Sequence, residues 1–325
     1  MPRTPDFWSA GTTSSLPALL SPLALLYGLG NRLNRAMARP QEVAVPVISV
    51  GNLVAGGAGK TPTAIALATR LKAMGYTPGM VSRGYGGSEA GPLRVDASLH
   101  DAARVGDEAL LLACAAPTWI GRDRPEAARA ACRAGCDILL ADDAHQTYAL
   151  ERDINLLVVD AAQGFGNGSL IPAGPLRESI AEGLARTDAV ILIGEPVRPF
   201  DFGDLPVFAA ALRPLAEDAA KLKDERVLAF AGIGRPEKFF STLESIGAHV
   251  AERQAFPDHG TYDADTVMRL VERAVALKAQ AVTTEKDLMR LPQEARAMVQ
   301  VLRVELTFQA PQQLEAFIAK ALTNA

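Results

Sequence analysis

The chain has 325 residues, a formal net charge of −4 and 49% hydrophobic residues. A chain of this length and apolar content can bury a large core and accommodates two domains. Its mild acidity argues against sequence-independent nucleic-acid binding, which needs a basic surface, and three cysteines are too few for a disulfide framework. We therefore expect a globular protein of a reducing, cytoplasmic compartment, with no nucleic acid among its partners.

The N-terminal segment, residues 1–40, combines a leucine-rich stretch with a basic flank. Leucines recur at helical spacing from Leu16 to Leu33, and the arginines come mostly after the apolar run rather than before it. The run is shorter than the roughly 20 residues that span a bilayer, and the late arginines do not fit a signal peptide. We expect an amphipathic helix in a membrane interface, shortened or kinked by Pro17 and Pro22. A helix packed on the domain core is the alternative.

A glycine-rich loop follows the apolar run Val43–Val50. A helix is predicted to start near Lys60, directly after the loop, with its amphipathic part over Thr63–Met74. In such a loop the backbone N–H groups surround a polyphosphate, the lysine reaches the β- and γ-phosphates, and the threonine hydroxyl holds Mg²⁺. The standard spacing G-x-x-x-x-G-K-[ST] places glycine where this chain has valine. The order of strand, loop, Lys-Thr and helix nevertheless predicts phosphate binding. The predicted nucleotide-binding residues are Val54, Ala55, Gly56, Gly57, Ala58, Gly59, Lys60 and Thr61.

Strands and helices then alternate along the chain as far as residue 193. The strands are apolar without alternation, which indicates a parallel sheet covered on both faces. The sequence therefore predicts an α/β fold of the P-loop NTPase type, with a mostly parallel sheet and helices on both faces. The predicted strands are Thr77–Ser82, Ile138–Ala141, Ile154–Val159 and Ala189–Ile193, and the predicted helices are Asp107–Ala116 and Pro125–Ala134.

The proline-rich and charged stretch Glu195–Arg226 marks a change of organisation. We interpret it as a domain linker, with short strands around Val207–Leu212, followed by a second and smaller α/β unit. The predicted division is 1–40 for the membrane-associated helical segment, 41–215 for the P-loop core domain and 216–325 for a C-terminal α/β domain that contributes to the active site. The predicted elements of this last domain are the strands Val227–Ala231, Ala281–Thr283 and Val299–Leu306 and the helices Glu237–Ile246, Asp265–Leu277 (capped by Asp263) and Pro311–Leu322.

Two aspartates, Asp142 and Asp143, stand at the carboxyl end of the predicted strand Ile138–Ala141. A carboxylate in this position holds Mg²⁺ in P-loop enzymes, although strands also end in aspartate for reasons of turn geometry. Together with the phosphate loop, the pair predicts a metal site formed by Thr61, Asp142 and Asp143.

Four further side chains are candidates for catalysis. Asp107 opens a predicted helix, where a carboxylate also acts as a simple cap. His259 follows Asp258 on a predicted loop, an arrangement that suits acid–base work and equally fits an exposed loop histidine. Arg83 and Arg177 lie in loops rich in glycine or proline and suit phosphate clamping, although a surface position is the default for arginine.

Eight segments, in order and spread over nearly the whole chain, resemble the tetraacyldisaccharide 4'-kinase (lipid A 4'-kinase) family. Members of that family read GGxGKT without the first glycine of the standard loop. They usually read D-D-G-x-Q-H where this chain has Ala144 for the glycine and Thr147 for the histidine, so no role is carried over for that histidine and the turn is expected to need no positive φ. Gly260 stands where a second histidine often follows the first. The segments are VGNLVAGGAGKTP (Val50–Pro62), VSRGYGG (Val81–Gly87), VGDEALLLA (Val105–Ala113), ADDAHQTYAL (Ala141–Leu150), LIPAGPLRES (Leu170–Ser179), FAGIGRPEKFF (Phe230–Phe240), FPDHGTY (Phe256–Tyr262) and VTTEKD (Val282–Asp287).

The resemblance implies an ATP- and Mg²⁺-dependent kinase in lipopolysaccharide biosynthesis. The acceptor would be the 4'-hydroxyl of a tetraacyldisaccharide 1-phosphate, a lipid-linked glucosamine disaccharide, and the product the bis-phosphorylated lipid A precursor. The enzyme would be peripheral or monotopic at the cytoplasmic face of the inner membrane. The implied roles are phosphate and Mg²⁺ binding for Lys60 and Thr61, the metal and phosphate site for Asp142 and Asp143, general base for Asp107 supported by His259, and stabilisation of the transferring phosphoryl group by Arg83 and Arg177, with Glu178 beside them.

Three other functions fit parts of the sequence. A membrane-associated nucleotide switch with a deviant Walker motif would need lysine where this chain has Ala55. A binding protein on a degenerate kinase fold would have lost Lys60, Thr61 or the aspartates, and all are present. A soluble small-molecule kinase would leave the leucine-rich N-terminus unexplained. The choice between monomer and dimer is left open by the sequence.

Overall fold

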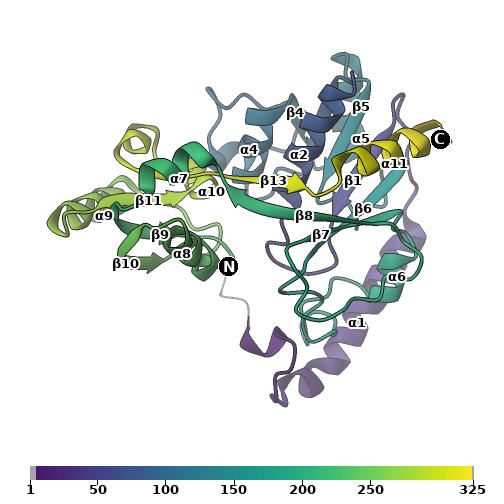
Figure 1. Cartoon of the computed structure of the whole chain (residues 1–325). Coiled ribbons are helices and arrows are strands. Elements are labelled where there is room, and N and C mark those ends of the chain that lie inside the picture. The colour runs from purple at the N-terminus through teal and green to yellow at the C-terminus, as the bar shows by residue number, and fades with distance from the viewer. Residues whose placement is uncertain (1–4, 324–325) are drawn as a thin grey trace.

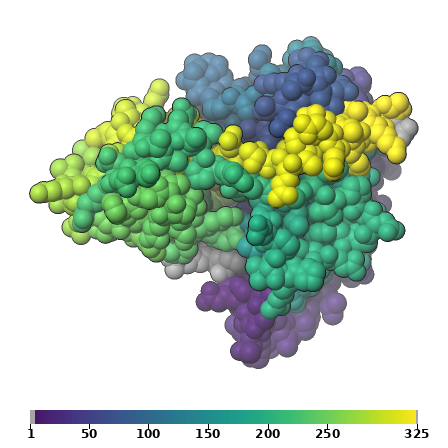
Figure 2. Space-filling model, viewed as in Figure 1, coloured from purple at the N-terminus to yellow at the C-terminus, as the bar shows by residue number. Residues whose placement is uncertain are grey.

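The structure, a computed structural model, describes residues 5–323 and contains two α/β units (Figure 1). We call the nine-stranded sheet with its helices the large unit, and the four-stranded sheet with its helices the small unit. Two strands, β8 (Val207–Pro214) and β13 (Val304–Phe308), run from the small unit into the large sheet. In the space-filling view the segments around these strands join the two units across the visible face (Figure 2).

The large sheet has the strand order β13-β8-β7-β6-β1-β5-β2-β4-β3. It is parallel except for the edge pairs β13–β8 and β3–β4. Its central strands are buried along nearly their whole length, which explains their uninterrupted apolar sequences. This confirms the predicted α/β fold with a mostly parallel sheet. The remaining strands are β1 (Val47–Gly51), β2 (Pro78–Ser82), β3 (Leu93–Arg94), β4 (Thr118–Ile120), β5 (Ile138–Asp142), β6 (Ile154–Asp160) and β7 (Ala189–Ile193).

Helices cover both faces of the large sheet. Alternate residues of β1, β2 and β5 pack into two different clusters, one with α2, α4 and α11 and the other with α5. Because successive side chains of a strand point to opposite faces, these helices lie on opposite sides of the sheet. The helices of the large unit are α2 (Lys60–Ala73), α3 (Ala102–Val105), α4 (Asp107–Ala115), α5 (Arg124–Arg133), α6 (Ile180–Leu184) and α11 (Pro311–Thr323).

The small sheet is parallel, with the order β10-β9-β11-β12. The helix α8 packs on one face through Phe240, and α9 packs on the other through Val267. Asp263 caps α9 as predicted, since its carboxylate accepts a 2.7 Å hydrogen bond from the backbone N–H of Thr266. The elements of the small unit are β9 (Arg226–Ala231), β10 (His249–Ala255), β11 (Gln280–Thr284), β12 (Gln300–Leu302), α7 (Ala216–Leu222), α8 (Pro236–Ser245), α9 (Ala264–Ala276), α10 (Glu285–Arg290) and the 3₁₀ helix η2 (Gln293–Met298).

The strand predicted around Val207–Leu212 is confirmed as β8, but the interpretation of Glu195–Arg226 as a linker is wrong. This stretch contains β8, which pairs with β7 and β13 inside the large sheet, and α7. Its prolines are misleading because Pro206 directly precedes β8 and Pro214 ends it, and a missing N–H is tolerated at the ends of a strand.

The single strand predicted over Val299–Leu306 is also wrong. The chain leaves the small sheet after β12 and enters the large sheet at β13, with Arg303 between the two strands. The apolar pattern continues through this point, so the sequence alone does not reveal the change of sheet. The predicted domain division stays a prediction, and the structure places β13 and α11 in the large unit.

The helix α1 (Leu16–Met37) follows the short 3₁₀ helix η1 (Asp6–Trp8) and projects from the large unit (Figures 1 and 2). Its prolines do not shorten it. Pro17 lies in the first turn, where its missing N–H costs nothing, and the Ser21 hydroxyl donates to the Ala18 carbonyl that Pro22 leaves without a backbone donor. Residues 1–4 of the predicted membrane segment lie outside the described residues.

The outer side of α1 is apolar. Ala24 is the one fully buried residue of the helix, while the large apolar side chains are exposed. None of the helices in the described part of the chain is both long and apolar enough to cross a membrane. The exposed apolar side chains are Leu16, Leu19, Leu23, Leu25, Leu26, Leu29, Leu33 and Met37.

Candidate active site

The phosphate loop lies between β1 and α2, at the edge of the large sheet where the parallel strands have their carboxyl ends. Residues 55–61 line a cavity of about 940 Å³ to which both units contribute. Gly56 and Gly59 have φ values of 113° and 87°, which glycine adopts readily. Val54 packs in the core and pairs with Leu176. The N-terminus of α2 therefore opens on the cavity, as phosphate binding requires.

Asp143 holds two cationic side chains of this edge together. Its carboxylate accepts hydrogen bonds of 2.9 and 3.1 Å from Arg177 Nη1 and lies 3.6 Å from Lys60 Nζ. Burial alone would raise the pKa of Asp143, but Lys60 and Arg177 hold it well below its usual range. Lys60 and Arg177 thus converge on one anionic group, which is the arrangement that a phosphate group needs.

Asp142 and Thr61 face each other beside the loop. The Thr61 hydroxyl donates to Asp142 Oδ2 at 3.4 Å, and Asp142 is 1% exposed. Within residues 5–323, the other carboxylate oxygen of Asp142 is buried without a hydrogen-bond partner. Burial, followed by the negative charge of Glu108, raises the pKa of Asp142 to about 7. A bound cation would favour the charged form of this carboxyl and satisfy its oxygen.

These oxygen donors fit Mg²⁺. This ion keeps several waters and takes one or two carboxylates together with substrate phosphates, rather than an all-protein cage. The described residues contain no group of three or more His, Cys, Asp or Glu side chains that could hold a metal by themselves.

Asp107 and His259 come from different units and meet beside the cavity, which His259 lines. Asp107 is the first residue of α4, and His259 lies on the loop between β10 and α9. His259 Nδ1 lies 3.1 Å from Asp107 Oδ2. Burial would raise the pKa of Asp107, but the hydrogen bond from His259 and the charge of Lys286 hold it below its ordinary value. Asp107 is therefore a buried carboxylate at neutral pH, not a simple exposed cap.

The sequence predicts no role in the site for three further residues of this cluster. Lys286 Nζ lies 3.2 Å from His259 Nε2 and 3.3 Å from Glu108 Oε1, and Arg290 Nε lies 3.5 Å from Asp107 Oδ2. Lys286 and Arg290 belong to α10, a helix of the small unit that is not predicted from the sequence.

A signal for this helix exists in the sequence. Thr284 accepts a hydrogen bond from the backbone N–H of Asp287, and its hydroxyl donates to the Asp287 carboxylate, a reciprocal cap of the T-x-x-D type. Recognising that motif in VTTEKD would have placed Lys286 in the first turn of a helix.

The remaining predicted residues differ in where they lie. Arg177 lines the cavity beside Asp143, and Glu178 is buried next to it, where Glu178 accepts hydrogen bonds from Gln146 at 2.8 Å and from Arg186 at 2.5 Å. Arg83 is exposed, and it is not among the described residues that line the cavity. The structure therefore brings Arg177 to the phosphate loop and leaves Arg83 outside it.

Two of the positions that depart from the family motifs, Ala144 and Thr147, lie in one turn after β5, where the Thr147 N–H donates a 2.9 Å hydrogen bond to the Ala144 carbonyl. Thr147 accepts a hydrogen bond from Arg124, whose guanidinium also donates to the backbone carbonyl of Asp143 at 2.9 Å. The expectation that this turn needs no positive φ is wrong, because Asp143 itself has a φ of 48°. The left-handed residue stands one position before Ala144, and aspartate tolerates this conformation better than most residues.

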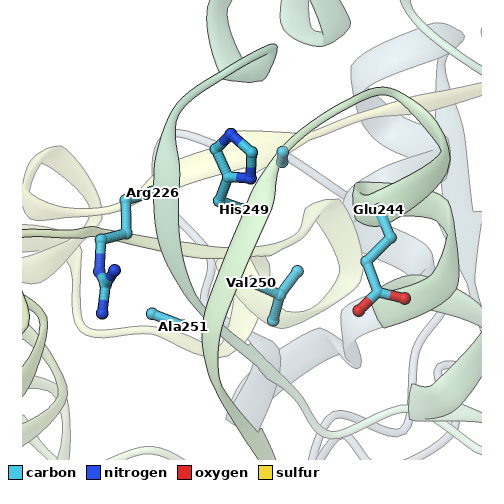
Figure 3. Close-up of a pocket in the computed structure, with 6 residues that line it drawn as sticks. Arg226, Glu244, His249, Val250 and Ala251 are labelled. Atoms are coloured by element: carbon cyan, nitrogen blue, oxygen red, sulfur yellow. The ribbon is translucent and has the colours of Figure 1, made fainter.

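A second hollow, of about 330 Å³, lies on the small unit and includes His249 (Figure 3). Arg226 and Glu244 stand on opposite sides of the strand that carries His249, so their charges do not converge. All three residues are exposed. We therefore place the functional site in the larger cavity between the units.

Comparison with known proteins agrees with this geometry. Residues 16–323 match the family model of LpxK, described as tetraacyldisaccharide-1-P 4'-kinase. The chain belongs to this family. The tetraacyldisaccharide 4'-kinase of Rhodospirillum centenum is 50% identical over 328 residues, which cover 99% of this chain and 97% of that protein. The corresponding kinase of Paramagnetospirillum magneticum is 48% identical over 313 residues, 95% of each chain.

The fold of the whole kinase has a solved counterpart. The crystal structure of LpxK from Aquifex aeolicus, in complex with ATP, superposes with a TM-score of 0.76 at 26% sequence identity. The alignment covers 94% of this chain and 99% of the Aquifex chain. The family resemblance, the P-loop NTPase-like fold and the kinase class predicted from the sequence are thereby confirmed.

Proposed function

We propose that this kinase transfers the γ-phosphate of ATP, with Mg²⁺, to the 4'-hydroxyl of a tetraacyldisaccharide 1-phosphate in lipid A biosynthesis. The observation that carries the proposal is that the phosphate loop and His259 line one cavity, and that His259 lies 3.1 Å from the buried carboxylate of Asp107. Phosphoryl transfer needs little covalent work from a protein, so positioning and charge compensation supply most of the catalysis. The Aquifex relative, solved in complex with ATP, supports the choice of nucleotide.

The phosphate end of the site follows from the loop geometry. Lys60 would bind the β- and γ-phosphates, and Arg177 would compensate the charge on the transferring phosphoryl group. Both side chains contact Asp143 and so already lie close together. Thr61 and Asp142 would hold Mg²⁺, with Asp143 beside them. When bound, Mg²⁺ neutralises charge on the phosphate oxygens. Arg83 could join the phosphoryl site only by moving toward it, and its role stays a prediction.

The acceptor end uses Asp107 as the general base. The 4'-hydroxyl gives its proton to the Asp107 carboxylate as its oxygen forms a bond to the γ-phosphorus. The bond from this phosphorus to the oxygen that bridges the β- and γ-phosphates breaks, and ADP leaves with that oxygen. His259 donates a hydrogen bond to Asp107 Oδ2 and fixes the orientation of the carboxylate.

The lipid nature of the acceptor explains the N-terminal helix. A row of exposed leucines along α1 suits insertion into the interface of a membrane, from which an acylated disaccharide would be taken. Such a helix would place the kinase as a peripheral or monotopic protein at the cytoplasmic face of the inner membrane. The side chain of Asn31 in α1 donates a 2.5 Å hydrogen bond to the backbone carbonyl of Arg177, so the membrane-facing helix is attached to the phosphate site.

The test is transfer of label from γ-labelled ATP to a tetraacylated glucosamine disaccharide 1-phosphate in detergent with Mg²⁺. We expect label in the lipid with wild type and none above background with Lys60→Ala. The Lys60→Ala variant should still bind ATP, although more weakly than wild type. The exposed lysine of α11, changed in Lys320→Ala, is the matched control and should leave transfer unchanged. Absence of labelled lipid with wild type, with ATP bound, would refute the proposal and favour a nucleotide switch or a binding protein.

A further inference from the structure

Both ring nitrogens of His259 are engaged, and by groups of opposite charge. Nδ1 lies 3.1 Å from a carboxylate oxygen of Asp107, and Nε2 lies 3.2 Å from the ammonium of Lys286. The three groups come from α4, the loop after β10 and α10, so the contact spans both units. A carboxylate oxygen accepts hydrogen bonds and an ammonium donates them, so the ring is placed between an acceptor and a donor.

This placement selects one state of the ring. The Lys286 ammonium can bond to Nε2 only if this nitrogen carries a lone pair, so the ring proton must sit on Nδ1 and be donated to Asp107. The opposite tautomer would direct a lone pair at the carboxylate and an N–H at the ammonium. A doubly protonated ring would add a positive charge beside that of Lys286.

Lys286 itself is held in its charged form. Burial alone would lower the pKa of Lys286, but the surrounding carboxylates, with Glu108 first, raise it above its ordinary value. The ammonium lies 3.3 Å from Glu108 and 4.0 Å from Asp258. Asp258 Oδ1 is also 3.8 Å from His259 Nε2, beyond hydrogen-bond distance and farther than the lysine.

From this geometry we infer that Lys286 is a positioning residue that keeps His259 singly protonated, as a hydrogen-bond donor to Asp107. The inference rests on the proposed function, in which Asp107 is the base. Its consequence is specific. The proton taken from the 4'-hydroxyl stays on the Asp107 carboxyl and is not passed to the ring, because Nδ1 already carries a proton and Nε2 faces an ammonium.

Two other side chains contact the pair and do not depend on Lys286. Arg290 Nε remains 3.5 Å from Asp107 Oδ2, and the Tyr85 ring packs edge-on against the His259 ring at 5.5 Å between centroids. Asp258 and Glu108 would face Nε2 without the ammonium between them. A variant without Lys286 therefore keeps the Arg290 contact to the Asp107 carboxylate, loses the ammonium 3.9 Å from that carboxylate, and opens Nε2 to a second proton.

The first test is nitrogen NMR of the His259 ring in the full-length protein in detergent at pH 7.5, assigned with His259→Gln. We expect a proton on Nδ1 and none on Nε2 in the wild type. A ring with its proton on Nε2, or protonated on both nitrogens, overturns the inference. This readout is independent of activity, so a wrong ring state overturns the inference even if lipid phosphorylation is not observed and the proposed function fails.

The second test is the pH profile of kcat for Lys286→Met and Lys286→Arg. We expect kcat of Lys286→Met to fall roughly threefold more than that of the wild type between pH 8 and pH 6, because an imidazolium paired with Asp107 leaves a weaker base. Lys286→Arg retains a donor with a positive charge and should follow the wild-type profile. Thermal unfolding confirms that each variant is folded, and Lys320→Met is the matched control. A Lys286→Met profile parallel to that of the wild type overturns the inference, since a purely structural lysine would lower kcat at every pH alike.

Discussion

At the scale of single residues, the phosphate site shows how much a local sequence can predict. Lys60 and Thr61 follow from the loop, and Asp142 and Asp143 follow because the carboxyl ends of parallel strands meet at one edge of a sheet. The tertiary contacts among them do not follow. That Asp143 would hold Lys60 and Arg177 together depends on the loop after β6, whose path no periodicity specifies.

Asp107, the proposed general base, can be tested by a single substitution. We expect Asp107→Ala to lower kcat by roughly 10²–10⁴-fold, the usual contribution of a general base, with ATP affinity nearly unchanged because the phosphate loop is intact. Steady-state kinetics on detergent-dispersed lipid would measure the loss, and equilibrium binding of ATP would measure the affinity. The exposed Asp204, changed in Asp204→Ala, serves as the control. Near-normal turnover of Asp107→Ala would remove Asp107 from the mechanism.

At the scale of elements, the sequence predicts long apolar strands well and short polar helices poorly. The six-residue helix α10 has too few residues for a periodic pattern, and its role comes from neighbours distant in sequence. Asp287 in this helix is fully buried and accepts hydrogen bonds from the Tyr262 hydroxyl at 2.6 Å and from the Gly232 N–H at 2.9 Å. These contacts fix α10 to the small unit and so fix Lys286 against His259.

The proposal gives the helix α1 two separable roles, and substitutions in its two groups of side chains can distinguish them. Its leucines face outward, while Asn31 holds the Arg177 carbonyl. We expect a triple variant with glutamine at Leu19, Leu25 and Leu26 to lose activity on substrate in vesicles, through weaker insertion, and to keep it on substrate in detergent. Co-sedimentation with vesicles should fall in parallel. Equal losses in the two assays would argue for a packing role of these leucines instead.

Asn31→Ala should behave in the opposite way. Losing the hydrogen bond to the Arg177 carbonyl loosens the loop that carries this arginine, which we propose to bind phosphate, so activity should fall severalfold in vesicles and detergent alike. Vesicle binding should be unchanged because the leucines remain. As a control, Asn34→Ala alters a neighbouring exposed asparagine of the same helix. A loss restricted to vesicles would show that Asn31 acts on membrane binding.

At the scale of the whole molecule, the candidate active site lies where the two units meet. Besides the contacts of Lys286 and Arg290, the carboxylate of Asp160, at the end of β6, binds Arg235 and lies 3.4 Å from Lys238 of α8. Burial would raise the pKa of Asp160, but the hydrogen bond and charge of Arg235 hold it below its ordinary value. The Asp160–Arg235 pair therefore stabilises the folded protein fully above about pH 4. This stabilisation is lost only as the pH falls through the lowered pKa of Asp160.

Contacts of this kind could not be predicted from the sequence. The residues that join the units are separated by 75 positions in the case of Asp160 and Arg235, and by 152 in the case of Asp107 and His259. Each lies on a loop or at the end of an element, where apolar periodicity carries no information. The sequence predicts that both units contribute to the site, and the structure supplies the contacts that align them.

The pair Asp160–Arg235 gives the last prediction, on the coupling of the units. Because Asp160 is buried and Arg235 partly exposed, we expect Arg235→Ala to weaken the closed arrangement by about 1 kcal/mol. Backbone amides of the phosphate loop and of the segment 232–235 should then exchange with deuterium roughly fivefold faster. Arg253 also pairs with a carboxylate, Glu244, but within the small unit, so Arg253→Ala should leave the exchange of the phosphate loop unchanged. Faster exchange in both variants would indicate general destabilisation, and no change in Arg235→Ala would show that the Asp160–Arg235 pair does not couple the units.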